Sequence, residues 1–279
     1  MKCVLLGATQ GCGLETLLNL IKEGHVCYVM CRTPSAFEAT LKEREVDINI
    51  TSEGKKLINP IKGDAFQEAD VRALFEAAGQ DVEFVLFSLG NYHICLPPLS
   101  YPVLTHTLGG RPSFKNPFAP KLLPPAICTR TTGIFLPVFT SCFPNPTTQP
   151  RLIIISSNGL GAQGHADLPG PLKPLYGWLL KEPHEDKEEM ERQINTGAGI
   201  EHVDFNPTGE DKGMLGNVII VRPALLTNGE ARGLESVNSG KTLPCAWTIS
   251  RKDVGLFIAT NCVQPDSPWR GSGVTVAYK

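Results

Sequence analysis

The stretch MKCVLLGATQGCGLETLLNLIKEGHVCYVMCRT (residues 1–33) decides the fold of this chain. Its apolar alternation predicts a strand over residues 2–6, an amphipathic helix over 14–23 and a second strand over 26–31. The turn between the first strand and the helix contains three glycines: Gly7, Gly11 and Gly13. Glycine loses more conformational freedom on folding than any other residue, so this cluster indicates that something approaches the backbone closely.

The same rhythm of short apolar strands and amphipathic helices continues along the chain. Further strands are predicted over residues 58–63, 84–89, 151–156 and 217–222. Further helices are predicted over residues 70–78, 126–139 and 182–195. Strands that alternate with helices at this spacing predict an α/β fold with a doubly wound parallel sheet, in a single domain over residues 1–279.

The pattern fails between residues 91 and 125, which include LPPLSYPVLTHTLGGRPSFKNPFAPKLLPP (96–125). This stretch is dense in proline and aromatic residues, and no regular element fits it. A loop of this length in a compact domain is usually functional or disordered. Because its aromatic side chains need burial, we expect an ordered cover over a substrate site.

The composition limits the function. The 279 residues are 42% hydrophobic and 19% charged with a net charge of −2, so neither nucleic acid nor a membrane surface is the expected partner. The apolar runs are too short to cross a bilayer, and the N-terminus does not resemble a secretory signal. Nine cysteines without C-x-x-C spacing indicate reduced, buried thiols in a cytoplasmic protein, with no metal site.

The glycine turn GATQGCG (7–13) lies at the place where a dinucleotide would bind. A helix N-terminus presents unpaired N–H groups and a partial positive charge, which suit a pyrophosphate. Glycines let the phosphates and the following helix come close. We therefore expect the turn, including Thr9, Gln10 and Cys12, to bind a dinucleotide; a tight turn kept only for packing is the alternative.

The end of the second strand distinguishes the two nicotinamide cofactors. Sites for NAD usually place an acidic residue there, whereas a cation suits the 2′-phosphate of NADP. In CYVMCRTPS (27–35), Arg32 stands at this position, and Thr33 and Ser35 add hydroxyl donors. The sequence therefore favours NADP(H), although a surface arginine after a strand has the same appearance.

Two other predicted strand ends complete the cofactor site. Asp64 follows the third strand, where its carboxylate could accept from the adenine amino group or cap the next helix. Ser88, Leu89 and Gly90 follow the fourth strand, beside the expected riboses. Ligands bind at the carboxyl ends of such strands, so position supports both assignments.

With these motifs placed, the chain resembles the atypical, NmrA-like short-chain dehydrogenases/reductases over nearly its whole length. The resemblance rests on GATQGCG, Arg32, KGD (62–64), IIISSNGLG (153–161), LYGWLLKEPHEDKEEMERQI (175–194) and NVIIVRPALLTNGE (217–230). It implies a Rossmann core, NADP(H) as cofactor, a small-molecule substrate, and a C-terminal region over residues 223–279 that partly binds the substrate. Gln10 departs from the pattern because many members carry glycine there.

The active site also departs from the conventional Tyr-x-x-x-Lys pair. Tyr176 is followed four residues later by Leu180, and Lys181 is one place out of phase on a helix. Pro183 suggests that the helix begins only after Lys181. A proton relay from Tyr176 to Lys181 is therefore not expected, although Tyr176 remains a candidate catalytic residue.

Lys187 is the stronger catalytic candidate, because the resemblance places a lysine here beside the nicotinamide ribose. Its charge would also stabilise negative charge that develops on a substrate carbonyl. A solvated lysine paired with Glu188 or Glu191 is the alternative.

Other candidates follow two more strands. Ser156 and Ser157 end the fifth strand, where polar groups bind a substrate oxygen or form a turn. In this fold Pro223, with Ala224, faces the nicotinamide carboxamide through main-chain groups. His165 and His184 are secondary candidates.

Three functions fit these motifs, and the oligomeric state stays open. The first is a reductase that uses NADPH on a small apolar carbonyl or conjugated substrate. The second is an enzyme of redox-neutral chemistry, a cyclase or isomerase of secondary metabolism, that retains the cofactor. The third is a non-catalytic NmrA-like redox sensor. The incomplete Tyr-Lys pair leaves the second open, whereas no docking surface for a sensor is evident in the sequence.

Overall fold

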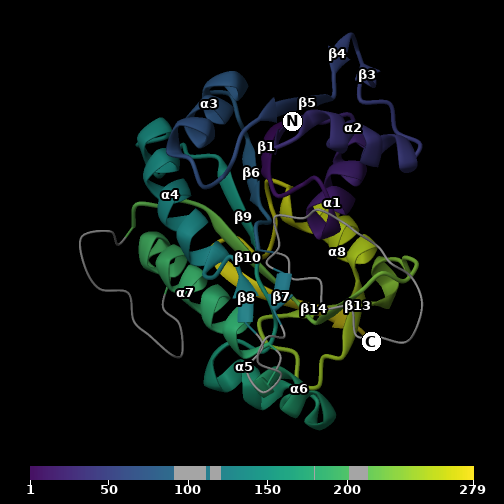
Figure 1. Ribbon diagram of the computed structural model, residues 1–279, viewed down its shortest axis with the longest axis vertical. Coiled ribbons are helices and arrows are strands. Elements are labelled where there is room, and N and C mark those ends of the chain that lie inside the picture. The colour runs from purple at the N-terminus through teal and green to yellow at the C-terminus, as the bar shows by residue number, and fades with distance from the viewer. Residues whose placement is uncertain (91–110, 114–120, 179, 201–212) are drawn as a thin grey trace.

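The computed structural model describes residues 1–90, 111–113, 121–178, 180–200 and 213–279. Its centre is an eight-stranded sheet in the order β12-β14-β10-β9-β6-β1-β2-β5 (Figure 1). Every neighbouring pair is parallel except β12 with β14. The strands of this sheet are β1 Lys2–Leu6, β2 Val26–Cys31, β5 Ile58–Lys62, β6 Phe84–Phe87, β9 Arg151–Ile155, β10 Val218–Pro223, β12 Val237–Gly240 and β14 Ser272–Tyr278.

The strand order places the site. Taken along the chain, β5-β2-β1-β6-β9-β10 is the order 3-2-1-4-5-6 of a doubly wound dinucleotide-binding sheet. The direction of winding reverses between β1 and β6, so the carboxyl ends of these two strands flank the crevice where ligands bind. The predicted α/β, Rossmann-type fold is confirmed.

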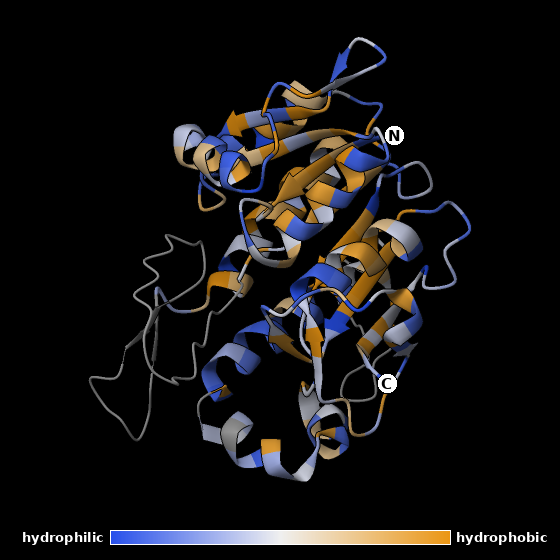
Figure 2. Cartoon of the chain, turned by 90° about the vertical axis from the view of Figure 1, so that its right-hand side faces the viewer, coloured by the Kyte–Doolittle hydropathy of each residue, from blue (hydrophilic) through white to orange (hydrophobic). Residues whose placement is uncertain are grey.

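Helices cover both faces of the sheet. Apolar side chains of α1, α2 and α8 form one buried cluster with the sheet, and those of α3, α4 and α7 form the other. Figure 2 shows the apolar residues concentrated in the strands and in the helix faces turned toward them. The helices are α1 Gly11–Lys22, α2 Pro34–Glu43, α3 Glu68–Ala78, α4 Ile127–Cys142, α5 Gly161–Asp167, α6 Lys173–Trp178, α7 Lys181–Ala198 and α8 Arg251–Phe257.

Smaller elements complete the described chain. Two of the short strand pairs are antiparallel, β3 with β4 and β7 with β8, and the pair of β11 with β13 is parallel. Their bounds are β3 Thr51–Ser52, β4 Lys55–Lys56, β7 Arg111–Ser113, β8 Lys121–Leu123, β11 Leu225–Thr227 and β13 Thr248–Ser250. Single helical turns span Gly170–Leu172, Leu234–Ser236 and Ile258–Cys262.

The prediction of an element-free segment over residues 91–125 was wrong in part. Arg111–Ser113 and Lys121–Leu123 pair as antiparallel strands, although this part of the chain is rich in proline. Residues 91–110 and 114–120, on which the expectation of an aromatic cover depends, lie outside the described residues. The helix predicted over 126–139 starts one residue later and continues to Cys142.

The C-terminal range 223–279, predicted to bind substrate in part, also builds the core. Strand β14 lies between β12 and β10 in the central sheet, and α8 packs against α1. Ser250 caps α8: its Oγ accepts from the Asp253 N–H at 3.0 Å. In the part of the chain that the structure describes, no helix has the length and apolarity needed to span a membrane.

Replacement of Gly255 by alanine tests the packing of α8 on α1. An added Cβ would lie 2.5 Å from the main-chain carbon of Glu15, so the two helices would have to separate. We expect Gly255→Ala to lower the free energy of unfolding by about 1–3 kcal/mol. Denaturant titration measures this, with Gly133→Ala as control: no atom lies within 4 Å of its added Cβ in α4, so that variant keeps or gains stability.

Candidate cofactor and active site

The glycine turn is shaped by close contacts between backbone segments. Gly7 has φ +82°, and a Cβ there would overlap the main-chain carbonyl of Ser88 at the end of β6. A Cβ on Gly13 would overlap the carbonyl of Gly7, so this glycine lets α1 start directly against the end of β1. Gly11 has φ +60°, which also favours glycine. The strand-to-helix turn thus has the close helix approach that the sequence predicted.

The start of α1 has an arrangement that suits an anion. Gln10 occupies the N-cap position with an extended backbone and makes no side-chain capping bond, and the first turn holds no acidic residue. The first N–H groups of the helix and its dipole are therefore directed at the crevice without a protein carboxylate. This donor set fits a pyrophosphate.

Two cations lie near this helix start. Burial raises the pKa of the Cys12 thiol to about 11, and the positive charges of Arg251 and Lys187 oppose that rise. Both cations therefore act on the first turn of α1. The Cys12 thiol itself stays protonated near neutral pH and is not a nucleophile there.

Arg251 is a site residue that the sequence reasoning missed. It begins α8, and its Nη1 donates to Asn228 Oδ1 at 2.7 Å. Its Nε is buried and has no hydrogen-bond partner among the described residues. The signal that could have located it is the capping pattern Ser250-x-x-Asp253, which marks the start of α8.

Arg32 and Thr33 lie between the end of β2 and the start of α2. Arg32 is exposed, and within the described ranges no hydrogen bond or ion pair holds it. Thr33 is the N-cap residue of α2, and Pro34 is its first helical residue. A guanidinium beside a helix N-terminus is an arrangement that suits a phosphate.

Asp64 has a structural role in the turn after β5. Its Oδ1 accepts from the N–H of Phe66 at 3.0 Å, and its own N–H donates to Asp70 Oδ2 at 2.8 Å. Because Gln67 holds the N-cap position of α3, the alternative that Asp64 caps this helix was wrong. Its contact with an adenine stays a prediction.

Residues 88–90 close the crevice at the end of β6. Ser88 and Leu89 are buried, and the hydroxyl of Ser88 has no partner among the described residues. Gly90 has φ +91°, and a Cβ there would overlap the thiol of Cys128 in α4. An unpaired buried hydroxyl at this edge fits a ligand oxygen.

The first turns of α7 connect three other elements. Lys187 is 7% exposed, and its Nζ donates to the main-chain carbonyl of Ser156 at 2.8 Å. Asp186 accepts from the N–H groups of Cys128 and Thr129 at 2.9 and 2.8 Å, and so caps α4. Burial lowers the pKa of Lys187. The alternative, that Lys187 is a solvated lysine on the protein surface, is therefore wrong.

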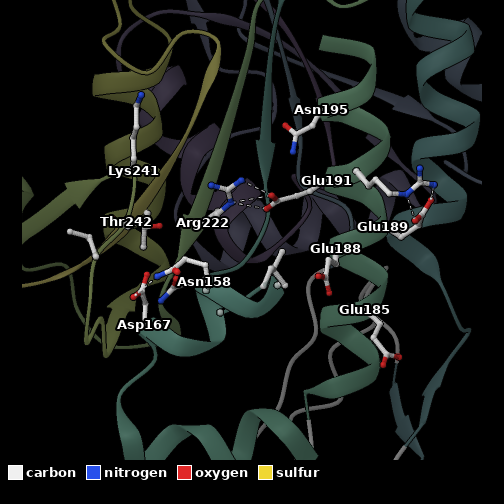
Figure 3. Close-up of a pocket in the computed structure, with 18 residues that line it drawn as sticks. Asn158, Asp167, Glu185, Glu188, Glu189, Glu191, Asn195, Arg222, Lys241 and Thr242 are labelled. Carbon is white, nitrogen blue, oxygen red and sulfur yellow. Dashed lines mark hydrogen bonds and ion pairs between the residues drawn. The ribbon is translucent and has the colours of Figure 1, made fainter. Parts of the chain in front are cut away.

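In α7, Asp186, Lys187 and Glu191 follow the pattern Asp-Lys-x-x-x-Glu, and the third of them forms a buried ion pair (Figure 3). Glu191 accepts from the Nε of Arg222 at 3.0 and 3.1 Å and from its Nη2 at 2.6 Å. The arginine of the V-R-P strand is thereby fixed to α7, and Pro223 follows it at the carboxyl edge. The Asp-Lys-x-x-x-Glu helix and the V-R-P strand thus form one connected unit.

A cavity of about 90 Å³ brings the predicted active-site residues together. Ser156, Ser157, Tyr176, Lys187 and Pro223 all line it, and so does Arg251. The hydroxyl of Ser156 is buried without a partner among the described residues. The other walls are largely apolar, formed by Leu180, Pro183, His184, Ala224, Leu225 and Leu226.

Tyr176 lies in α6, outside the helix that carries Lys187. Burial raises the pKa of its hydroxyl to about 12, so it keeps its proton at neutral pH. The ring of His184 stands edge-on to it, with centroids 5.0 Å apart. Lys181 is exposed and lies 4.0 Å from Glu185, so the structure contains no Tyr176–Lys181 relay. Helix α7 begins at Lys181 itself, one residue before the predicted start.

Two main-chain groups predicted to face the nicotinamide already have partners in the sheet. The carbonyl of Pro223 accepts from the N–H of Asn158, and the N–H of Ala224 donates to Val276, both at 2.9 Å. The role of Pro223 toward a carboxamide stays a prediction. His165, a secondary candidate, lies exposed on α5.

Fold and site geometry define an α/β protein with a doubly wound sheet and a candidate dinucleotide site, and comparisons agree at the level of fold. No protein-family model matches the chain. It is similar to the reductase pytE of Aspergillus terreus, 27% identical over 98% of this chain and 96% of the relative. It is also similar to the oxidase pynE of Aspergillus niger, 25% identical over 91% and 89% of the two chains.

Solved structures show the same fold. The anaerobilin reductase ChuY of Escherichia coli O157:H7 is similar with a TM-score of 0.62 and 16% identity, over 100% of this chain and 97% of that one. A short-chain dehydrogenase/reductase of Veillonella parvula in complex with NADP has a TM-score of 0.60 and 11% identity, over 99% and 94%. The fold is that of the atypical short-chain dehydrogenases/reductases, which confirms the resemblance seen in the sequence.

The partial burial of His184 predicts a loss of stability in mild acid. Burial, and secondly the charge of Lys187, lower its pKa from 6.5 to about 4. The unfolded chain therefore binds a proton below pH 6.5 that the folded chain excludes until about pH 4. The contribution of neutral His184 to the free energy of unfolding is fully present above pH 6.5. About 2 kcal/mol of that free energy is lost between pH 7 and pH 5.

Denaturant titrations of wild type and His184→Gln at both pH values measure this loss. The variant should lack about 2 kcal/mol of the pH dependence. The control His165→Gln alters an exposed imidazole and should retain the wild-type difference. Equal pH dependence in wild type and His184→Gln would show that His184 is protonated as readily in the folded chain as in the unfolded one.

Proposed function

We propose that this protein is an NADP(H)-dependent reductase that acts on a small apolar carbonyl or conjugated substrate. The observation that carries the proposal is the convergence of two features at one edge of the sheet. These are the uncapped start of α1 and the cavity that contains buried Lys187 beside Ser156. The first fits a dinucleotide phosphate, and the second fits a reacting carbonyl.

The residues fit a nicotinamide dinucleotide along the whole edge. The N–H groups at the start of α1, together with Arg251, would hold the pyrophosphate. Arg32 and the start of α2 would hold the 2′-phosphate, and Ser88 would meet a ribose. The buried unpartnered atoms at this edge, Ser88 Oγ, Ser156 Oγ and Arg251 Nε, are polar groups that a ligand would satisfy.

A bound nicotinamide supplies the electrons for reduction. The chain's own contribution is electrostatic: Lys187 and the hydroxyls of Ser156 and Ser157 would stabilise the oxygen on which negative charge develops. Tyr176, which keeps its proton, would act as a hydrogen-bond donor rather than as a base. Lys187 stays oriented because its Nζ donates to the Ser156 carbonyl.

The cavity walls and the comparisons support the substrate class and the reaction. Leucine, proline and alanine side chains border the polar groups, which favours an apolar substrate body. Relatives of nearly the same length carry the names reductase and oxidase, and a structure of the same fold was solved with NADP. We extend these names to this chain as part of the proposal.

The preference for NADP(H) is tested by Arg32→Gln. Loss of the guanidinium removes a charge-assisted bond to the 2′-phosphate, so NADPH should bind about tenfold or more weakly, while NADH binding stays unchanged. Lys42→Gln removes the same charge from the far end of α2 and serves as the control. Equal weakening of both cofactors in Arg32→Gln would contradict the assignment.

Catalysis is tested by following the absorbance of NADPH with a panel of apolar ketones and enones. Wild type should consume NADPH with at least one of them. Lys187→Met, of similar volume, should lower kcat by about 100-fold or more, because it removes the charge near the reacting oxygen. Cofactor affinity, measured by calorimetry, separates this loss from a failure to bind.

Redox-neutral chemistry has a different outcome in this assay. Tight NADPH binding without consumption across the panel would favour redox-neutral chemistry, for which the missing Tyr176–Lys181 relay is the supporting observation. Wild-type turnover in Lys187→Met would remove this residue from the mechanism.

A further inference from the structure

The cap at the start of α8 includes a side chain from β14. In a capping box, the side chain at the third helical position accepts from the main-chain N–H of the N-cap residue. Here the N–H of Ser250, the N-cap residue, donates instead to the hydroxyl of Tyr278 at 3.1 Å. That hydroxyl donates in turn to Oδ2 of Asp253, the third helical residue. Tyr278 is therefore a bridge between the two halves of the capping box.

The same carboxylate also holds a second segment of backbone. Asp253 is buried, and it accepts from the N–H of Arg232 at 2.8 Å and from the N–H of Gly233 at 3.1 Å. The Cζ atom of Arg232 lies 4.2 Å from the centroid of the Tyr278 ring. The start of α8 is thereby tied to the segment before β12 and to the end of β14. A buried polar network with its groups bonded in this way rigidifies the structure around it.

The helix start that this network fixes carries Arg251 into the crevice. Arg251 borders the proposed active-site cavity, and its charge acts on Cys12 at the start of α1. Its Nη1 donates to Asn228 Oδ1 at 2.7 Å, whereas its Nε has no hydrogen-bond partner in the described chain. The main chain of Arg251 follows directly on the N-cap residue. The direction in which the guanidinium leaves the helix therefore depends on the Tyr278 bridge.

We propose that Tyr278 is a positioning residue for the cofactor: through the cap of α8 it orients Arg251 toward the pyrophosphate. The inference rests on the proposed function, because it takes the dinucleotide to bind at the start of α1. Tyr278 is absent from the described residues that line the active-site cavity, so its hydroxyl acts through Arg251. Hydrogen bonds weaken steeply with misalignment, so a displaced guanidinium would hold the pyrophosphate less well.

Tyr278→Phe tests the proposal, because it removes the bridging hydroxyl and keeps the ring beside Arg232. We expect NADPH to bind about fivefold more weakly to this variant in calorimetry. Arg251→Gln should weaken binding by about tenfold or more. Added to Arg251→Gln, Tyr278→Phe should cause no further loss, because no guanidinium remains to be oriented. A hydroxyl that only stabilises the fold would change the affinity by the same factor in both backgrounds, and that result would overturn the proposal.

An NMR measurement on the free protein separates this proposal from the proposed function. Tyr278→Phe should shift the Nε–H signal of Arg251 without any cofactor present. The control Tyr28→Phe removes a hydroxyl from the middle of β2 and should leave that signal unmoved. An unmoved Arg251 signal in Tyr278→Phe would overturn the positioning role alone. A wild-type protein that does not bind NADPH would overturn the proposed function, and with it the cofactor role of Tyr278.

Discussion

The site depends on the close approach of three backbone segments at the ends of β1 and β6. Gly7 lies against the Ser88 carbonyl, and Gly13 lies against Gly7, so neither position has room for a side chain. This contact fixes the start of α1 over the crevice where the strand order reverses. Because no side chain caps that start, its N–H groups and dipole are left for a ligand. The glycines thus serve the packing and the proposed phosphate site together.

Helix α7 joins the remaining parts of the site through three side chains within two turns of the helix. Asp186 caps α4, Lys187 bonds to the end of β9, and Glu191 pairs with Arg222 of β10. Each of these charges is buried and partnered, which is the condition under which a buried charge is tolerated. Helix α7 therefore connects α4, the end of β9 and β10 around the proposed active site.

Much of the fold could be predicted because buried parallel strands read as apolar runs between helical patterns. Strands β1 and β2 were predicted to the residue, whereas α2 and α8 were missed because each is short and mixes polar with apolar positions. The site was predictable where a motif marks a strand end or a helix, as for Ser156 and Lys187, which line one cavity. Arg251 was not, because its importance depends on contacts between elements far apart in the chain.

The central claim is that a dinucleotide phosphate rests on the start of α1. The most direct measurement is an amide NMR titration of the ¹⁵N-labelled protein with NADP. The account predicts that the backbone signals of Gly11, Cys12 and Gly13 shift most, together with the side-chain signal of Arg251. Saturation with NADP that leaves the Gly11–Gly13 amides unmoved would contradict it.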